Sequence, residues 1–96
     1  MPVRQSTSNY RLPGKSIHSL DEFYDEIARL LHFPEYFGRN LDALWDLLTT
    51  DIVGPVELIW EDSAISKKSM GKDFARVTTL LRDLVKERKD FTVSFH

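Results

Sequence analysis

The segment from residue 33 to residue 51 constrains the fold of this chain most, because its apolar residues follow the period of a helix. At about 100° per residue, four leucines share one side of that helix, and this side is expected to face a core; they are Leu41, Leu44, Leu47 and Leu48. Asn40 is a good N-cap, since its side-chain oxygen can accept from an unpaired N–H of the first turn. Gly38 can supply the positive φ that a turn before the helix needs. The pattern predicts a helix over about 41–50.

The opposite side of this helix is acidic and repels itself. Asp42, Asp46 and Thr49 follow at i, i+4 and i+7, and Trp45 lies at the border with the apolar side. Like charges at i, i+4 cost about 0.2–0.5 kcal/mol. Only Asp42 is close enough to the N-terminus to recover some of this from the helix dipole. The side is either an ordinary solvated face, which composition alone favours, or a surface for a positively charged partner.

Residues 34–46 read PEYFGRNLDALWD, and this run resembles the signature segment of the barstar family. Members of that family are intracellular inhibitors of secreted bacterial ribonucleases. The resemblance extends, more weakly and without obvious gaps, from about Tyr10 to His96. It changes the preferred interpretation of the acidic side from a solvated face to a binding face, and it implies a barstar-like α/β fold.

The resemblance also implies which residues bind. In barstars the helix and the loop before it plug the ribonuclease active site, with carboxylates in the places of RNA phosphates. On this basis Asp46 is the central acid, held by arginines and the catalytic histidine of the enzyme, and Asp42 is a second acidic contact. Tyr36 packs against the catalytic centre. The other ribonuclease-binding positions implied are Asn40, Leu41, Trp45, Thr49 and Asp83.

Several of these positions have a purely structural alternative. Tyr36 could anchor its loop on the core, although tyrosine is enriched at interface hot spots. The N-cap role alone could explain Asn40, and half-buried packing could explain Trp45 equally well. Asp83 falls where the type member of the family has a glutamate, so its reach is one methylene shorter.

Four positions depart from the pattern of that type member. Phe37 replaces a second tyrosine, and Arg39 puts a positive charge where an acid stands. Thr50 and Asp51 replace glycine and tryptophan, which removes an apolar contact and adds a charge. These departures imply an altered rim and a cognate ribonuclease different from the type enzyme.

The rest of the chain supplies the other elements of an α/β domain. Strands are expected at 9–12, 56–60 and 91–95, helices at 20–32 and 73–88, and a short polar helix within 61–68; Ser19, Asp73, and Asp62 or Ser63 are the expected N-caps. The order β-αα-β-αα-β places helices between successive strands, and such connections need parallel neighbours and right-handed crossovers. It therefore predicts a three-stranded parallel sheet packed with about four helices. We expect a single domain over 9–96 after a flexible tail at 1–8.

Charge and composition narrow the class of partner. Residues 34–51 carry a net charge of −3, and the other residues carry 12 basic and 11 acidic side chains, a net of +1. An acidic patch repels nucleic acid and attracts basic proteins. The absence of cysteine excludes disulfides and thiolate nucleophiles. No apolar run approaches the ~20 residues of a membrane span, and the N-terminus lacks a signal peptide, so we expect a cytoplasmic protein.

No catalytic set emerges from the sequence. His18, His32 and His96 have no neighbouring motif for a metal or a nucleophile, and the glycines are isolated. We therefore expect neither enzyme activity nor a cofactor or metal, and a free monomer that binds one barnase-type or toxin ribonuclease in a one-to-one complex. Two alternatives stay open: a module of the same fold with another basic partner, and a small metal-dependent enzyme that uses Asp42 and Asp46.

Overall fold

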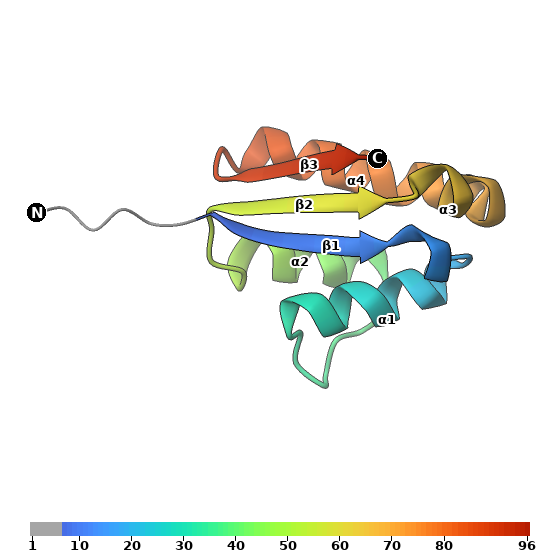
Figure 1. Cartoon of the computed structure of the whole chain (residues 1–96). Helices are drawn as coiled ribbons and strands as arrows, with labels where there is room; N and C mark the ends of the chain where they lie inside the picture. Colours follow the sequence, from blue (N-terminus) through green and yellow to red (C-terminus); the bar gives the residue numbers. More distant parts are fainter. Residues whose placement is uncertain (1–6) are drawn as a thin grey trace, which may run out of the picture.

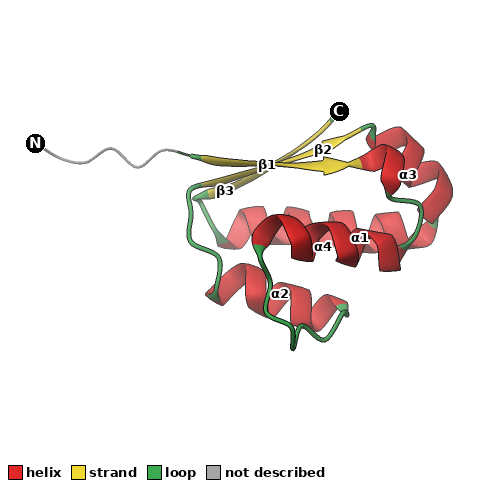
Figure 2. Cartoon of the chain, turned by 60° about the horizontal axis from the view of Figure 1, so that its bottom comes forward, coloured by secondary structure: helices red, strands yellow, loops and turns green. Residues whose placement is uncertain are grey.

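The computed structural model describes residues 7–96 and shows an α/β domain built on a three-stranded parallel sheet (Figure 1). The elements are β1 (Ser8–Pro13), the 3-10 helix η1 (Gly14–Ser16), α1 (Leu20–Leu31), α2 (Leu41–Thr50), β2 (Val56–Glu61), α3 (Ser63–Met70), α4 (Lys72–Glu87) and β3 (Phe91–Phe95). Figure 2 shows α1, α4 and α2 on one side of the sheet and α3 at its end. The predicted element order and fold class are confirmed, and only η1 was not expected.

The sheet has the order β1-β2-β3, so β2 is its central strand. Leu12 pairs with Trp60, which in turn pairs with Phe95. Ser8 belongs to β1 and not to the expected tail, because it pairs with Val56. Of the remainder of that tail, Thr7 is exposed and precedes the strand, and residues 1–6 lie outside the described residues. All β2 side chains that point toward the helices are fully or almost fully buried, as expected for the middle strand of a sheet covered on that side.

Trp60 is the centre of the core. Its side chain is fully buried and stacks on Phe23, with 5.3 Å between the ring centroids and 15° between the planes. The ring of Phe74 packs 5.0 Å away at a tilt. The indole Nε1 donates to Ser66 Oγ at 3.0 Å, and Ser66 Oγ donates to the carbonyl oxygen of Gly14 at 2.9 Å. This buried relay joins β2 to α3 and η1, which are far apart in the sequence.

The helix ends agree only partly with the expected caps. Ser19 caps α1 by accepting from the Glu22 N–H at 3.1 Å, and the Glu22 carboxylate accepts from the His18 N–H. Neither Asp62 nor Ser63 caps α3 with its side chain, since Asp62 is left-handed at φ 51° and the Ser63 hydroxyl donates to the carbonyl of His96. The expected Asp73 cap of α4 is also wrong: the helix begins one residue earlier, after Gly71 at φ 60°, with no side-chain cap.

α2 packs mainly on α4 rather than on the sheet, and it forms the outermost layer in Figure 2. Its own residues Leu44 and Leu48 are fully buried. Arg88, which follows α4, holds the C-terminal end of α2: its Nη1 donates to the carbonyls of Leu48 and Ile52 at 2.7 and 2.8 Å. The Arg88 guanidinium also donates twice to the Asp90 carboxylate, at 2.9 and 2.8 Å. The C-terminal end of α2 is therefore fixed from a distant part of the chain.

Removing the hydroxyl of Ser66 should destabilise the protein more than its size implies. Ser66→Ala leaves the Trp60 indole N–H buried without a partner, at a cost of about 1–3 kcal/mol, whereas the Gly14 carbonyl still accepts from the Ile17 N–H at 3.2 Å. The free energy of unfolding in urea measures this. Ser69→Ala, an exposed serine on the same helix, is the control and should change little. Equal stability of the two variants would mean that the relay contributes nothing.

The Arg88–Asp90 pair predicts a loss of stability in acid. Hydrogen bonds from Arg88 hold the pKa of the Asp90 carboxyl below its usual value. Its contribution is therefore fully present above the unfolded-state pKa of about 3.9 and is lost as the pH falls through the lower folded-state pKa. Asp90→Asn should flatten the dependence of the unfolding free energy on pH below about 4. Asp62→Asn, which removes a carboxylate without an arginine partner, is the control, and identical slopes for all three proteins would contradict the prediction.

Candidate functional site

The outer side of α2 presents unpaired carboxylates. Asp42 and Asp46 are exposed, Thr49 and Trp45 are half-buried, and Asp83 is exposed on the facing side of α4. Within residues 7–96, ion pairs engage many acids elsewhere, but no lysine, arginine or histidine forms one with Asp42, Asp46 or Asp83. The charge on this side of α2 is thus left available to an outside group.

The loop between α1 and α2 divides its aromatic residues between the core and the solvent. Phe33 and Phe37 turn inward, with 5.0 Å between their ring centroids, and Phe37 meets the buried Tyr24 edge-on at 5.6 Å. Tyr36 turns outward and is 79% exposed. The alternative of Tyr36 as a loop anchor is therefore wrong, because Phe33 and Phe37 perform that task. Phe37, which replaces a tyrosine of the type member, packs on the core.

Tyr36 and Asp46 are brought together by the return of the loop onto α2. Both line a hollow of about 140 Å³, whose other walls are Phe37, Gly38, Ala43 and Leu47. An exposed phenol and an exposed carboxylate at one hollow suit a partner group that is both planar and cationic. Cations stack on aromatic faces and form charge-assisted bonds with carboxylates.

A second hollow joins residues that are about forty positions apart. Asp42, Trp45 and Asp83 line a groove of about 310 Å³ between α2 and α4, together with Leu41, Arg76, Thr79 and Leu80. A neighbouring hollow of about 330 Å³ runs past Asn40, Leu41 and Asp42 toward Tyr24 and Arg39. Asp83 thus lies beside the acids of α2, as the sequence implied. Trp45 packs on the core and also faces the groove, so both of its interpretations stand.

Asn40 caps α2 as expected, and Gly38 differs from expectation. The Asn40 side-chain oxygen accepts from the Ala43 N–H at 2.8 Å, and its Nδ2 donates to the carbonyl of Gly38 at 3.2 Å. The positive φ of the turn belongs to Arg39, at 49°, and not to Gly38. The glycine instead allows a close approach, because a Cβ there would lie 3.2 Å from Asn40 Nδ2 and 3.4 Å from Ala43 Cβ.

Thr49 is occupied within its own helix. Its hydroxyl donates to the carbonyls of Trp45 and Asp46 at 2.8 and 3.2 Å. It also lines none of the hollows described above. Seven of the eight residues implied by the resemblance line the two grooves beside Asp42, of about 310 and 330 Å³, or the hollow that Tyr36 and Asp46 share. Thr49 lies apart from them.

Comparison with known proteins gives the same family as the motif. Residues 7–96 match the family described as "Barstar (barnase inhibitor)". The chain belongs to the barstar family. A protein of Bacillus subtilis (strain 168) named "Putative ribonuclease inhibitor YrdF" is 32% identical to it over 79 residues, which are 82% of this chain and 87% of that protein.

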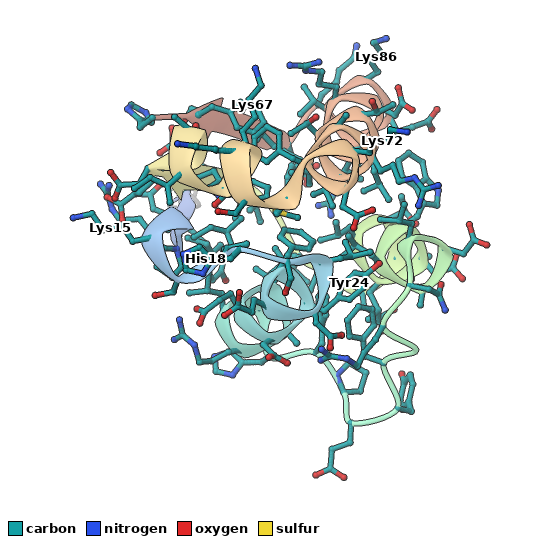
Figure 3. All side chains as sticks on the ribbon, turned by 90° about the vertical axis from the view of Figure 1, so that its right-hand side faces the viewer. Lys15, His18, Tyr24, Lys67, Lys72 and Lys86 are labelled. Atoms are coloured by element: carbon teal, nitrogen blue, oxygen red, sulfur yellow. The ribbon has the colours of Figure 1, made fainter. Side chains whose placement is uncertain are left out.

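Arg39, one of the four departures from the barstar pattern, does not simply add a positive charge to the rim. Its guanidinium turns onto α1, where it pairs with Asp25 at 2.9 Å and with Asp21 at 3.1 Å. It also lies over the ring of Tyr24, 5.8 Å from the centroid. Burial and the nearby Asp73 raise the pKa of the Tyr24 phenol, so the phenol stays neutral beside these groups. Figure 3 shows Tyr24 on the side of α1 toward α2 and the loop.

Sequence reasoning missed Arg76 and the partners of Arg39. Arg76 lines both grooves beside Asp42 and makes a long ion pair of 3.7 Å with Asp73 on its own helix. Its place on the polar side of α4 was predictable, but not the contact of that side with α2. No local pattern connects Arg39 to residues 14 and 18 positions earlier.

The described residues show neither a metal cluster nor a membrane helix. No group of three or more histidines, cysteines, aspartates or glutamates is gathered in residues 7–96. No helix among the same residues has the length and apolar character that crossing a membrane requires.

Loss of the Asn40 cap should weaken α2. Asn40→Ala removes the acceptor for the Ala43 N–H and should lower the unfolding free energy by about 1 kcal/mol. Asn40→Asp keeps that acceptor, although it loses the donor to Gly38, and should stay close to the wild type. Urea unfolding compares the three proteins. Equal stability of Asn40→Ala and the wild type would show that the cap seen in the structure contributes nothing.

Proposed function

We propose that this protein inhibits a ribonuclease, of the secreted barnase type or a toxin domain, by placing α2 and the loop before it in the active site. One observation carries the proposal: in a member of the barstar family, the acids around these grooves are exposed and have no ion-pair partner among the described residues. A fold selected for stability alone would pair or disperse such charges.

The chemistry of a ribonuclease makes it a suitable partner. An active site that binds RNA phosphates must present cations, and arginine forms paired bonds with carboxylates as it does with phosphates. Asp46, beside Tyr36, takes the place of a phosphate in that pocket. Asp42 lies one turn earlier on the same side and, with Asp83, binds a second cation across the groove. The inhibitor thus blocks the pocket both sterically and electrostatically, in a one-to-one complex.

The distribution of charge also favours rapid association. Lys67, Lys72 and Lys86 lie on α3 and α4, away from the loop that carries Tyr36 (Figure 3). These lysines therefore do not oppose a cationic partner at the loop, and Arg76 is the cation that lies beside Asp42 in both grooves. Complementary potentials mainly raise the association rate, and salt reduces this gain. Tyr36 and Trp45 add apolar area that excludes water from the contact.

The biological setting follows from the same proposal. A cell that makes a ribonuclease needs an inhibitor where its own RNA lies, so we infer that this protein acts in the cytoplasm, as an immunity protein, and as a monomer until it binds. It performs no reaction of its own. A basic partner that is not a ribonuclease is the competing identity, and a panel of microbial and toxin ribonucleases separates the two. If no ribonuclease is bound or inhibited, the proposal is wrong.

Asp46→Ala should weaken inhibition without weakening the fold. Removing one partner of a buried ion pair costs about 3–5 kcal/mol, so the Kd for the inhibited ribonuclease should rise by at least about 100-fold. Thermal stability should be equal or slightly higher, because repulsion with Asp42 is relieved. Titrating inhibition of RNA cleavage measures the first effect, and a thermal melt measures the second.

Asp62→Asn is the matched control, because it also removes one exposed carboxylate that has no ion-pair partner among the described residues, just before α3 and away from α2. Its Kd should change less than threefold. A similar loss in both variants would mean that only net charge matters, and a large fall in the melting temperature of Asp46→Ala would make that carboxylate structural.

A further inference from the structure

We propose that Arg39 is a positioning residue that holds the loop at 33–40 in its binding conformation before any partner arrives. This inference rests on the proposed function, since the loop carries Tyr36. The feature behind it is the attachment of the loop to α1 by one guanidinium group. That attachment depends on an arginine at a position where the type member of the family has an acid.

The contacts of Arg39 form a fork across one turn of α1. Nη1 donates to Asp25 Oδ1 at 2.9 Å, and Nη2 donates to Asp21 at both its carboxylate and its backbone carbonyl, at 3.1 and 3.0 Å. Hydrogen bonds to these two aspartates raise the pKa of Arg39 further, so its charge is permanent. Single surface ion pairs contribute little, but a planar fork that engages several acceptors is the favourable case.

The backbone at Arg39 needs such support. Its φ of 49° lies in the left-handed region, which side chains other than glycine seldom adopt unless the surroundings impose it. The next residue, Asn40, is extended at φ −146° and is the N-cap of α2. The turn at Arg39 thus sets the angle at which the loop enters α2, and the fork and the face of Tyr24 hold that turn from the side.

The fork controls the part of the loop that the core does not hold. Phe33 and Phe37 anchor its first half, and the Phe37 N–H donates to the Pro34 carbonyl at 3.0 Å. Tyr36 lies between Phe33 and Phe37 in the chain, at the hollow shared with Asp46 of α2. Arg39 fastens the chain after Phe37, where it enters α2, and so fixes the anchored part of the loop relative to that helix. Holding Tyr36 and Asp46 in one arrangement reduces the ordering that binding would otherwise require, which is the usual source of affinity from preorganisation.

The same contacts remove an electrostatic conflict. A free arginine beside Asp42 would repel a cationic active site. Because Asp21 and Asp25 neutralise it on α1, the loop gains a fastener without a net positive charge at the contact. We therefore predict that Asp21 and Asp25 matter for binding, although α1 carries none of the proposed binding residues.

Amide hydrogen exchange in the free protein tests the fastening itself. In Arg39→Gln the Phe37 amide should exchange at least about tenfold faster than in the wild type, while core amides of β2 stay unchanged. Arg39→Lys keeps the charge but not the fork, and it should restore protection only in part. Arg29→Gln is the matched control, because it removes an arginine–carboxylate pair with Glu26 elsewhere on α1. Unchanged Phe37 exchange in Arg39→Gln overturns the proposal, whether or not a ribonuclease binds.

Binding to the inhibited ribonuclease tests the consequence. Arg39→Gln should raise the Kd about tenfold, and the double variant Asp21→Asn/Asp25→Asn should raise it at least as much, because it also leaves the charge of Arg39 without its partners. The triple variant should be no worse than either, because all three changes break one fork. Additive losses, or full binding restored by Arg39→Lys, would make Arg39 a direct contact and overturn the positioning role. Failure of every ribonuclease to bind the wild type would overturn the proposed function, while the exchange result would stand on its own.

Discussion

The burial of Leu44 and Leu48 decides how α2 meets the solvent, and the binding surface depends on it. Fully burying one leucine contributes about 1.5–3 kcal/mol, which far exceeds the few tenths that Asp42 and Asp46 lose by repelling each other. The apolar side therefore fixes the rotation of the helix about its axis. The two aspartates must then point outward, whatever their mutual repulsion.

Fixing the rotation of α2 about its axis does not fix the position of the helix, and contacts at its two ends do so. Asn40 caps the first turn, and Arg88 binds the last carbonyls from beyond α4. Arg88 is itself held by Asp90, the residue before β3. Because α2 lies on α4 and not on the sheet, these polar contacts take over the alignment that strand packing gives to other helices. The backbone that carries the two carboxylates therefore needs little further ordering when a cation binds them.

The sequence predicted what local pattern controls and missed what distant pairing controls. The period of the leucines gave the bounds of α2 at both ends, and the alternation of β3 gave that strand. The αL residue of the turn was misassigned because glycine is the usual choice, whereas the contacts of Arg39 with α1 impose that conformation on a larger residue. The missing cap at Asp73 has a similar cause, since Gly71 turns the chain so that α4 begins before the aspartate. Asp83 was singled out through the family resemblance and not through any spacing; it lines the groove with Asp42, and its role in binding stays a prediction.

The departures from the barstar pattern act in opposite directions on the charge of the surface. Arg39 looks in the sequence like a gain of positive charge, but Asp21 and Asp25 cancel it on α1. Asp51 is exposed at the end of α2 and has only a hydroxyl of Thr50 as a partner, so its negative charge remains. The binding side is thus more acidic than the sequence difference implies. Complementary charge governs association rate and the choice of partner more than affinity. For the proposed ribonuclease partner we therefore infer added cations around the pocket rather than an apolar rim.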